Sequence, residues 1–438
     1  MSEALFFAWT SFAAAWCICA YYSLVIRRAP FYHPINLFLA YFLVGYAYSA
    51  FADWYLEHSF LWQYTGVHPT ASDVYFTAFI SNVGLFTFVF VPPLLVRGVH
   101  TGLEMPRTKL VVANKHRFAL AAVFFTILGL IGTRYTIPTD NTVLGYRVAE
   151  TLTGEQRLVD LSGYQTLPSH FLVALLMIWY FRSGVTRLNV LVTILYTIVR
   201  FYQGNERFGF LALGFSLVIA IAVRRGIRLP KLRYLAFALV LAAAFDILGT
   251  NRLAIRDVLA GNRTFGEVVQ EYQTKNSGEL PLANLREFDC TAMVVALVPD
   301  ATGFNWFTQY LRLFIWPIPR YLWPDKPVYT ANIVWPYYGR FFGQTISMMG
   351  DAYSNCGLMS LVLVMALYGI GLSFLYKRAQ ITNSPAVFLA NAIFAISTPV
   401  LFRDGEVGAY LFIFAWLFVA LCFSRFGGLR LARAAREQ

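Results

Sequence analysis

Eleven apolar runs, separated by short polar gaps, constrain the fold of this chain more than any other feature of its sequence. A helix needs about 20 apolar residues to cross the hydrocarbon core of a bilayer, so the shorter runs must extend into their polar flanks. The pattern predicts an all-α polytopic membrane protein with about eleven transmembrane helices. The runs cover residues 5–26, 35–52, 74–96, 118–133, 170–181, 188–202, 208–223, 235–247, 357–376, 386–402 and 407–423.

The composition agrees with this interpretation. Of the 438 residues, 58% are hydrophobic and only 13% are charged, whereas soluble domains carry about a quarter charged residues. The net charge of +12 raises the possibility of nucleic-acid binding. The basic residues, however, gather in the short gaps between apolar runs, and no basic groove interleaved with aromatic residues is present. The charge therefore reflects membrane topology.

The distribution of Lys and Arg predicts the orientation in the membrane. The gaps 27–28, 97–117, 182–187, 224–233 and 377–378 and the tail from residue 425 together hold 20 Lys and Arg but only two acidic residues. Basic loops stay in the cytoplasm. The N-terminus is therefore expected outside and the C-terminus inside, in agreement with an odd number of spans.

Three regions follow from this topology. Residues 1–249 form eight spans with short loops, residues 250–356 form a long outer loop, and residues 357–438 form three further spans and a basic tail. Within the long loop, residues 265–272 and 285–298 have helical spacing of apolar residues, and residues 304–318 are aromatic enough to lie on or dip into the membrane. The chain has no internal repeat, so an inverted-repeat transporter finds no support.

Two arginines at an outer turn are the first candidate binding residues. Arg200 and Arg207 flank a short turn that contains Glu206. Arginine suits bidentate phosphate binding because its donors form a rigid planar fork. Alternatively, Glu206 neutralises its basic neighbours at the membrane interface.

A proline-rich stretch at residues 316–327 supplies the second candidate group. Its four prolines make the backbone stiff and non-helical, which places Arg320 and Lys326 at defined positions beside indole rings such as that of Trp323. Aromatic rings next to cations suit a sugar that carries an anionic group. The alternative is an interfacial aromatic belt with a Pro-rich turn.

The third candidate group runs into the ninth span. Gly350 and Gly357 permit close backbone approach or a sharp turn, and Asp351 and Tyr353 are expected just above the membrane. Alternatively, Asp351 or Asn355 caps the following helix.

A charged turn between the last two spans completes the set of candidates. It contains Arg403, and a turn stabilised by ion pairs is the alternative explanation. This arginine shares a predicted location with the other outer cations, near membrane ends and against the inside bias. An outward cluster of this kind indicates an anionic headgroup such as a lipid-linked phosphate or diphosphate. The cluster comprises Arg200, Arg207, Arg320, Lys326, Arg340 and Arg403.

Several motifs are missing from the sequence. It contains no HExxH, no Asp-x-Asp pair and no Gly-rich phosphate loop, and the long outer loop has no histidine. These observations argue against a metal ion, a cofactor or a nucleotide sugar. Charges within the apolar runs are scarce, Asp246 being the chief example, which argues against an ion-coupled transporter.

The candidate segments resemble motifs of the bacterial oligosaccharide repeat-unit polymerases, or O-antigen polymerases. The matching strings are GNER at 204–207, PRxxWPDKP at 319–327, GDAYSNCG at 350–357 and FRDG at 402–405. The resemblance covers the second half of the chain, and PRxxWPDKP is its most specific element. It implies a fold similar to the C-type glycosyltransferases, in the branch shared with O-antigen ligases. Such enzymes transfer a glycan from a polyprenyl-diphosphate carrier without a metal ion.

The resemblance also implies roles for individual residues. Arg207 and Arg320 would bind the diphosphate with help from Arg403 or Arg200. The acceptor hydroxyl needs a base. The ligases use a loop histidine that this chain lacks, and Asp351 stands where a glutamate is expected. Asp351 is therefore the first candidate for the base and Glu206 the second. The expected substrate-binding residues are Lys326, Tyr353, Trp323 and Arg340.

These observations predict a polymerase that joins polyprenyl-diphosphate-linked oligosaccharides, as donor and acceptor, into a surface polysaccharide. It would act at the periplasmic face of the bacterial inner membrane, with a separate chain-length regulator as a possible partner. One alternative is a ligase that moves finished glycan to another lipid acceptor. Another is a non-enzymatic flippase or exporter of lipid-linked sugars, which would need polar groups along a path through the membrane.

Overall fold

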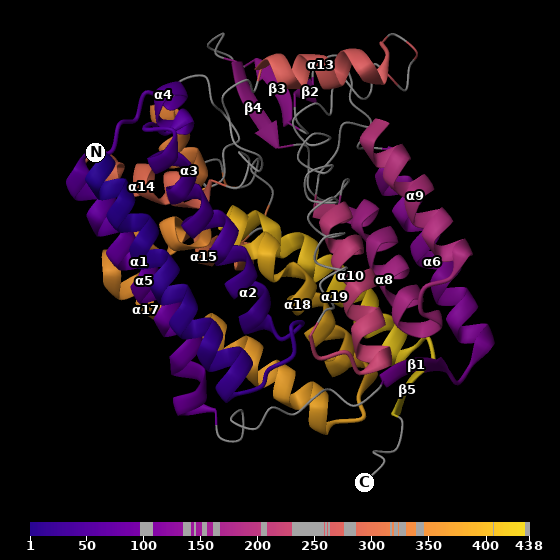
Figure 1. Cartoon of the computed structure of the whole chain (residues 1–438). Helices are drawn as coiled ribbons and strands as arrows, with labels where there is room; N and C mark the ends of the chain where they lie inside the picture. The colour runs from indigo at the N-terminus through magenta and orange to yellow at the C-terminus, as the bar shows by residue number, and fades with distance from the viewer. Residues whose placement is uncertain are drawn as a thin grey trace. The chain divides into compact units, whose positions relative to one another are not determined.

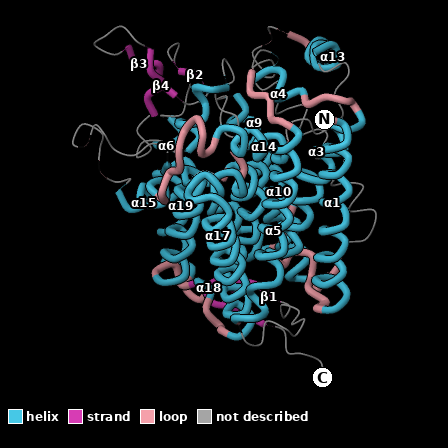
Figure 2. The backbone as a smooth tube through the Cα atoms, turned by 90° about the vertical axis from the view of Figure 1, so that its left-hand side faces the viewer, coloured by secondary structure: helices cyan, strands magenta, loops and turns pink. Residues whose placement is uncertain are grey.

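The structure of the chain is a computed structural model dominated by helices, with strands in two small groups (Figures 1 and 2). The residues it describes are 1–96, 108–134, 142–143, 146–150, 156–160, 167–202, 208–229, 258, 261, 263–275, 286–315, 318, 323, 330–338, 346–405 and 407–433.

The chain divides into two compact units. Unit 1 comprises Met1–Glu104, Leu285–Ile381 and Ser397–Leu411, and unit 2 comprises Met105–Asn284, Thr382–Ile396 and Phe412–Gln438. The division passes through two helices, α18 (Pro385–Asp404) and α19 (Val407–Arg425). Each unit therefore combines segments that are far apart in the sequence.

The first part of unit 1 contains three long apolar helical stretches. Helix α5 (Ala71–Leu95) packs against α1 and α17. It begins with a capping box, because the Asp73 amide donates to Thr70 Oγ1 (3.3 Å) and the Thr70 amide donates to Asp73 Oδ2 (2.7 Å). The other elements are α1 (Ser2–Ala20), the π-helix η1 (Tyr21–Ile26), α2 (Pro34–Phe42), the π-helix η2 (Leu43–Tyr48), α3 (Ser49–Tyr55) and α4 (Phe60–Thr65).

The second part of unit 1 lies at the end of the predicted outer loop and in the span that follows. Helix α14 (Glu287–Leu297) lies where residues 285–298 predict a helix. It is buried along almost its whole length and contacts α3, α5 and α17, so this part of the loop belongs to the core. The remaining elements are α15 (Thr308–Ile315), α16 (Thr330–Val334), the 3-10 helix η4 (Trp335–Tyr338) and α17 (Met348–Ile381).

Unit 2 is built around the antiparallel helices α6 and α8. A Cβ at Gly129 would lie 2.6 Å from the Leu172 side chain, and one at Gly132 would lie 2.5 Å from the Ser169 nitrogen, so these glycines permit the close approach. The elements, besides parts of α18 and α19, are α6 (Lys115–Arg134), the 3-10 helix η3 (Leu167–His170), α8 (Phe171–Ser183), α9 (Arg187–Tyr202), α10 (Phe208–Arg225) and α13 (Phe265–Lys275), the last where residues 265–272 predict a helix.

Two small antiparallel sheets, both in unit 2, add to the predicted all-helical architecture. One pairs β1 (Thr108–Val112) with β5 (Leu429–Arg433), and the other has the order β2 (Thr142–Val143), β3 (Tyr146–Glu150), β4 (Gln156–Asp160). The strands are five residues long or shorter and lie in polar gaps, where a search for apolar runs does not find them.

The helices coincide with the predicted apolar runs. Ten of the eleven runs are helical, and the run at 235–247 lies outside the described residues. By length and composition, six helices of the described part of the chain are able to cross a membrane, which identifies a multi-pass membrane protein. The number of spans and their orientation remain predictions. The six are Ser2–Ile26, Pro34–Tyr55, Ala71–Leu95, Lys115–Thr133, Met348–Ile381 and Pro385–Arg403.

Candidate functional site

A break in α17 is the local feature around which the candidate site forms. Cys356 (φ −159°, ψ 36°) and Gly357 (φ 70°, ψ −146°) leave the helical conformation, and the positive φ of Gly357 suits a residue without a Cβ. Ser360 stabilises the break, since its Oγ accepts from the Cys356 amide (2.8 Å) and donates to the Ala352 carbonyl (2.7 Å). Gly357, the last residue of the GDAYSNCG motif, therefore lies between two helical segments of α17.

A loop before α15 binds the polar groups that the break exposes. The amides of Asn305 and Trp306 donate to the carbonyls of Ser354 (2.9 Å) and Asn355 (3.0 Å), and the Phe307 amide donates to Asn355 Oδ1 (3.0 Å). Carbonyls at a helix end have no partner within the helix and need one elsewhere. The loop supplies these partners and is thereby fixed against the start of α17.

Asp351 lies at the centre of this arrangement and is fully buried. Its Oδ2 accepts from Gln309 Nε2 (2.6 Å) and from the Tyr310 hydroxyl (3.1 Å). The Thr330 hydroxyl donates to Gln309 Oε1, which turns the amide nitrogen of Gln309 towards Asp351. Asp351 Oδ1 accepts no hydrogen bond from any described residue. The carboxylate is thus oriented by two neutral donors through one oxygen, and the other oxygen is buried with no hydrogen-bond partner among the described residues.

Tyr310 remains a donor over a wide pH range. Burial raises the pKa of its hydroxyl well above the usual value, and the charge of Asp351 raises that pKa further. The protonated hydroxyl therefore continues to donate to Asp351 under alkaline conditions.

The helix that supplies Tyr310 has its apolar face outward. On α15, Gln309 and Arg312 are buried, whereas Leu311 is 58% exposed and Phe314 is 82% exposed. A helix with this distribution suits an apolar environment on its outer face, as at a membrane interface. The sequence predicts such a location for residues 304–318.

A chain of hydroxyl groups links the start of α17 to α14. Ser347 Oγ lies 2.7 Å from Thr291 Oγ1 and accepts from the Tyr46 hydroxyl (3.2 Å). It also accepts from the Gly350 amide (3.0 Å), and so caps α17 four residues before Asp351. Polar side chains from η2, α14 and α17 thus meet in the interior of unit 1.

The charged turn at 403–405 packs against the same capping residue. Gly405 has φ +61°, and a Cβ there would lie 2.1 Å from the Ser347 carbonyl oxygen. Only glycine allows this approach without a backbone shift. Two of the four predicted motifs, GDAYSNCG and FRDG, are therefore adjacent in unit 1, and Arg403 is half-buried.

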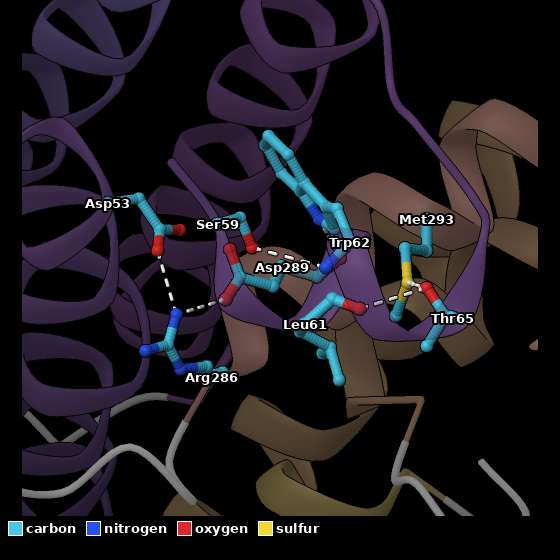
Figure 3. Close-up of polar contacts among 8 residues, drawn as sticks. All are labelled: Asp53, Ser59, Leu61, Trp62, Thr65, Arg286, Asp289 and Met293. Carbon is cyan, nitrogen blue, oxygen red and sulfur yellow. Dashed lines mark hydrogen bonds and ion pairs between the residues drawn. The ribbon is translucent and has the colours of Figure 1, made fainter. Parts of the chain in front are cut away.

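A buried ion triad lies on the α14 side of this polar region (Figure 3). Arg286 Nη1 lies 2.8 Å from Asp53 Oδ1 on α3 and 3.3 Å from Asp289 Oδ2 on α14. The Trp62 indole donates to the Asp289 carbonyl (3.3 Å) and so joins α4 to the triad. Buried charges of this kind are stable only when paired, and removal of one partner is strongly destabilising.

Glu287, which follows Arg286 at the start of α14, is a further buried carboxylate in unit 1. Its side chain packs against Gly45 of η2, where a Cβ would lie 2.8 Å from Glu287 Cγ, and it interacts with Tyr41. Arg403 is within electrostatic range of the same tyrosine. Single π-turns inside α-helices occur frequently at functional sites, and η2 contributes both Gly45 and Tyr46 here.

The structure describes five of the ten predicted site residues. Asp351 and Arg403 lie near Ser347 in unit 1. Tyr353 is also in unit 1 but packs its ring against Phe76, with 5.8 Å between ring centroids. Trp323 is 39% exposed, and Arg200 is buried in unit 2. The predicted roles of all ten stay predictions. Glu206, Arg207, Arg320, Lys326 and Arg340 lie outside the described residues.

Several polar residues of the site were not singled out in the sequence. Asp53 follows the second apolar run directly, and helix α3 carries this run on to Tyr55, so the charge lies inside a candidate span. Gln309 and Arg286 lie in the predicted outer loop, residues 250–356. The only signal was three charged residues clustered at 286–289 beside a buried apolar run.

Comparison of the chain with protein-family models, with curated proteins and with solved structures finds no match. Among the described residues, no group of three His, Cys, Asp or Glu side chains is placed to hold a metal ion.

Proposed function

We propose that the protein is a metal-independent glycosyltransferase that polymerises polyprenyl-diphosphate-linked oligosaccharide repeat units. The reaction would take place at the outer face of the bacterial inner membrane and produce a surface polysaccharide. The observation that carries the proposal is the buried carboxylate of Asp351, which Gln309 and Tyr310 orient through one oxygen while the second oxygen has no hydrogen-bond partner among the described residues. This is the arrangement that a general base for a sugar hydroxyl requires.

In the proposed reaction, the hydroxyl oxygen of the acceptor sugar bonds to the anomeric carbon of the donor. At the same time, Asp351 Oδ1 accepts the proton of that hydroxyl group. The bond between that carbon and the diphosphate oxygen breaks, and the polyprenyl diphosphate leaves with the electron pair. The neutral donors Gln309 and Tyr310 hold the carboxylate in place during the transfer. The negative charge of the leaving group is stabilised by arginines, for which Arg207, Arg320 and Arg403 are the candidates.

The proposed topology has eleven spans, with the N-terminus outside and the C-terminus inside. It places the start of α17, and therefore Asp351, near the outer membrane face. The outward apolar face of α15 supports this position, because Leu311 and Phe314 would be stable against lipid at the interface.

Complementation of a deletion strain tests the proposal. With Asp351→Asn we expect single repeat units on the cell surface where the wild type makes long chains. The exposed Asp300 provides a matched control, and Asp300→Asn should restore the full ladder of chain lengths. A normal ladder with Asp351→Asn would refute the role of this carboxylate.

The same strains separate the two alternatives. If the protein is a ligase, glycan should be absent from its final acceptor in the deletion strain while long lipid-linked chains accumulate. If it is a flippase, repeat units should accumulate on the cytoplasmic side of the membrane. Either pattern in the deletion strain would contradict polymerisation.

A further inference from the structure

Unit 2 contains a long apolar cavity of about 480 Å³ between α6, α8 and α9. Its lining on α6 extends from Phe118 to Thr133, which corresponds to about 22 Å along a helix. The hydrocarbon core of a bilayer is about 30 Å thick. The cavity therefore runs along most of a membrane-spanning length and is slender for its volume.

The wall of the cavity is almost entirely aliphatic and aromatic. Trp179 of α8 and Leu195 and Val199 of α9 are representative of it. Leu195 and Val199 are also 53% and 50% exposed, so the cavity borders the outer surface of α9. A hydrocarbon chain that entered from the surrounding lipid would meet mostly apolar side chains along the middle of the cavity, where Thr126 and Tyr196 are the polar exceptions.

The two ends of the cavity differ in their arginines. Arg182 is exposed at the end near Phe118, where its guanidinium stacks on the phenyl ring (4.8 Å to the centroid). Arg200 lies at the other end, near Thr133, and is only 4% exposed. A guanidinium largely removed from water at the end of an apolar cavity is a strong binding group for a phosphate, because the interaction is weakly screened there.

We propose that this cavity binds the isoprenoid chain of a polyprenyl phosphate, with the phosphate on Arg200. The slender shape fits a single chain, whereas a phospholipid carries two. Arg200 lies at the outer end in the proposed topology, which is the side on which the lipid-linked glycan is used. The choice of a polyprenyl lipid rests on the proposed function, while the cavity and its arginine do not.

Photocrosslinking to the purified full-length protein in lipid nanodiscs tests this proposal. The probe is a polyprenyl phosphate that carries a diazirine on its isoprenoid chain. We expect the crosslinks to map to α6, α8 and α9. Unlabelled polyprenyl phosphate should compete for the site, whereas polyprenol without the phosphate should compete about tenfold less well, since a hydrogen bond to a charged group is lost.

Matched variants identify which features of the cavity matter. Arg200→Ala should weaken probe binding about tenfold, and Leu195→Trp should weaken it as strongly by filling the cavity. Arg182→Ala, at the opposite end, should bind as the wild type does. Ile194→Trp should do the same, because Ile194 is on α9 but does not line the cavity. Thermal unfolding of each variant shows that it is folded.

Three results would overturn the proposal. They are equal competition by phosphatidylglycerol, crosslinks that map away from these helices, and unchanged binding to Arg200→Ala. The assay contains no glycan, so its result is independent of polymerisation. If the protein binds the probe but does not elongate chains, the cavity assignment stands and the proposed function is contradicted. If it elongates chains but does not bind the probe, the proposed function stands and the cavity assignment is contradicted.

Discussion

The two units of the chain bury very different side chains, although both have the apolar composition of a membrane protein. Unit 1 encloses charged and hydroxyl groups from α3, α14 and α17, which are far apart in the sequence and pair with one another. Unit 2 contains an apolar cavity that borders the outer surface of α9 and has an arginine at each end. The polar interior is fixed by many specific contacts, whereas the cavity has few polar groups to satisfy.

This difference suggests a division of labour. Burial of Asp351 and the Arg286 triad costs free energy, and such groups persist when the surrounding contacts satisfy them. An apolar cavity with one buried cation instead suits a ligand that is itself a long hydrocarbon with an anionic end. We therefore propose that unit 1 carries out proton transfer and that unit 2 binds lipid, and the following predictions test that proposal.

The largest effect is expected from Asp351→Asn. The amide has the size of the carboxylate but cannot accept the proton, so elongation should fall by about two to four orders of magnitude. Probe binding in unit 2 should not change. The rate is measured with purified protein and lipid-linked oligosaccharide, and a rate within threefold of wild type would contradict the assignment of the base.

The ion triad should dominate the stability of unit 1. Arg286→Met leaves Asp53 and Asp289 buried without their cation, which should cost about 3–5 kcal/mol of unfolding free energy. The measurement is thermal or denaturant unfolding in detergent. Arg182→Met in unit 2 is the control, since its exposed guanidinium should contribute little. Equal losses in the two variants would remove the contrast between the units.

Close packing of the charged turn on α17 predicts a smaller loss. Gly405→Ala would place a Cβ against the Ser347 carbonyl at a positive φ, at a cost of about 1–3 kcal/mol. Gly371→Ala on the same long helix is the control, because a Cβ there has no neighbour within 4 Å. It should leave stability unchanged or raise it slightly. Unfolding of both variants under one set of conditions checks the difference.

The smallest effect is expected from Tyr310→Phe. One of two donors to Asp351 Oδ2 is lost, about 1 kcal/mol, so elongation should slow by only a few fold. Because the raised pKa keeps Tyr310 protonated, the alkaline limbs of the wild-type and variant pH–rate profiles should coincide up to about pH 10. A wild-type limb that disappears in the variant would show that Tyr310 ionises during the reaction.

Much of the helical framework could be predicted from the sequence. Apolar runs place helices well because a lipid-facing helix must satisfy all of its backbone groups internally. The break at Gly357 could also be predicted, since glycine in a polar motif at the start of a span indicates a turn. The small strands were missed because their apolar residues are too few to stand out.

The interior of unit 1 could not be predicted in the same way. Helical spacing placed α14 correctly, but periodicity does not reveal that Glu287 and Asp289 are buried rather than solvated. The partner of Arg286, Asp53, is more than two hundred residues away, and such long-range pairs leave no local signal. Gln309 and Tyr310, which donate to Asp351, were also missed, because these pairs are far apart in the sequence and leave no local signal.

The most direct test of the account is elongation by the purified protein. Given polyprenyl-diphosphate-linked oligosaccharide in EDTA, the wild type should form lipid-linked chains of several repeat units, and Asp351→Asn should leave the substrate unchanged. The contrary result is that neither protein elongates the substrate in EDTA and that the wild type does so only after a divalent ion is added. This result would contradict metal-independent polymerisation at Asp351.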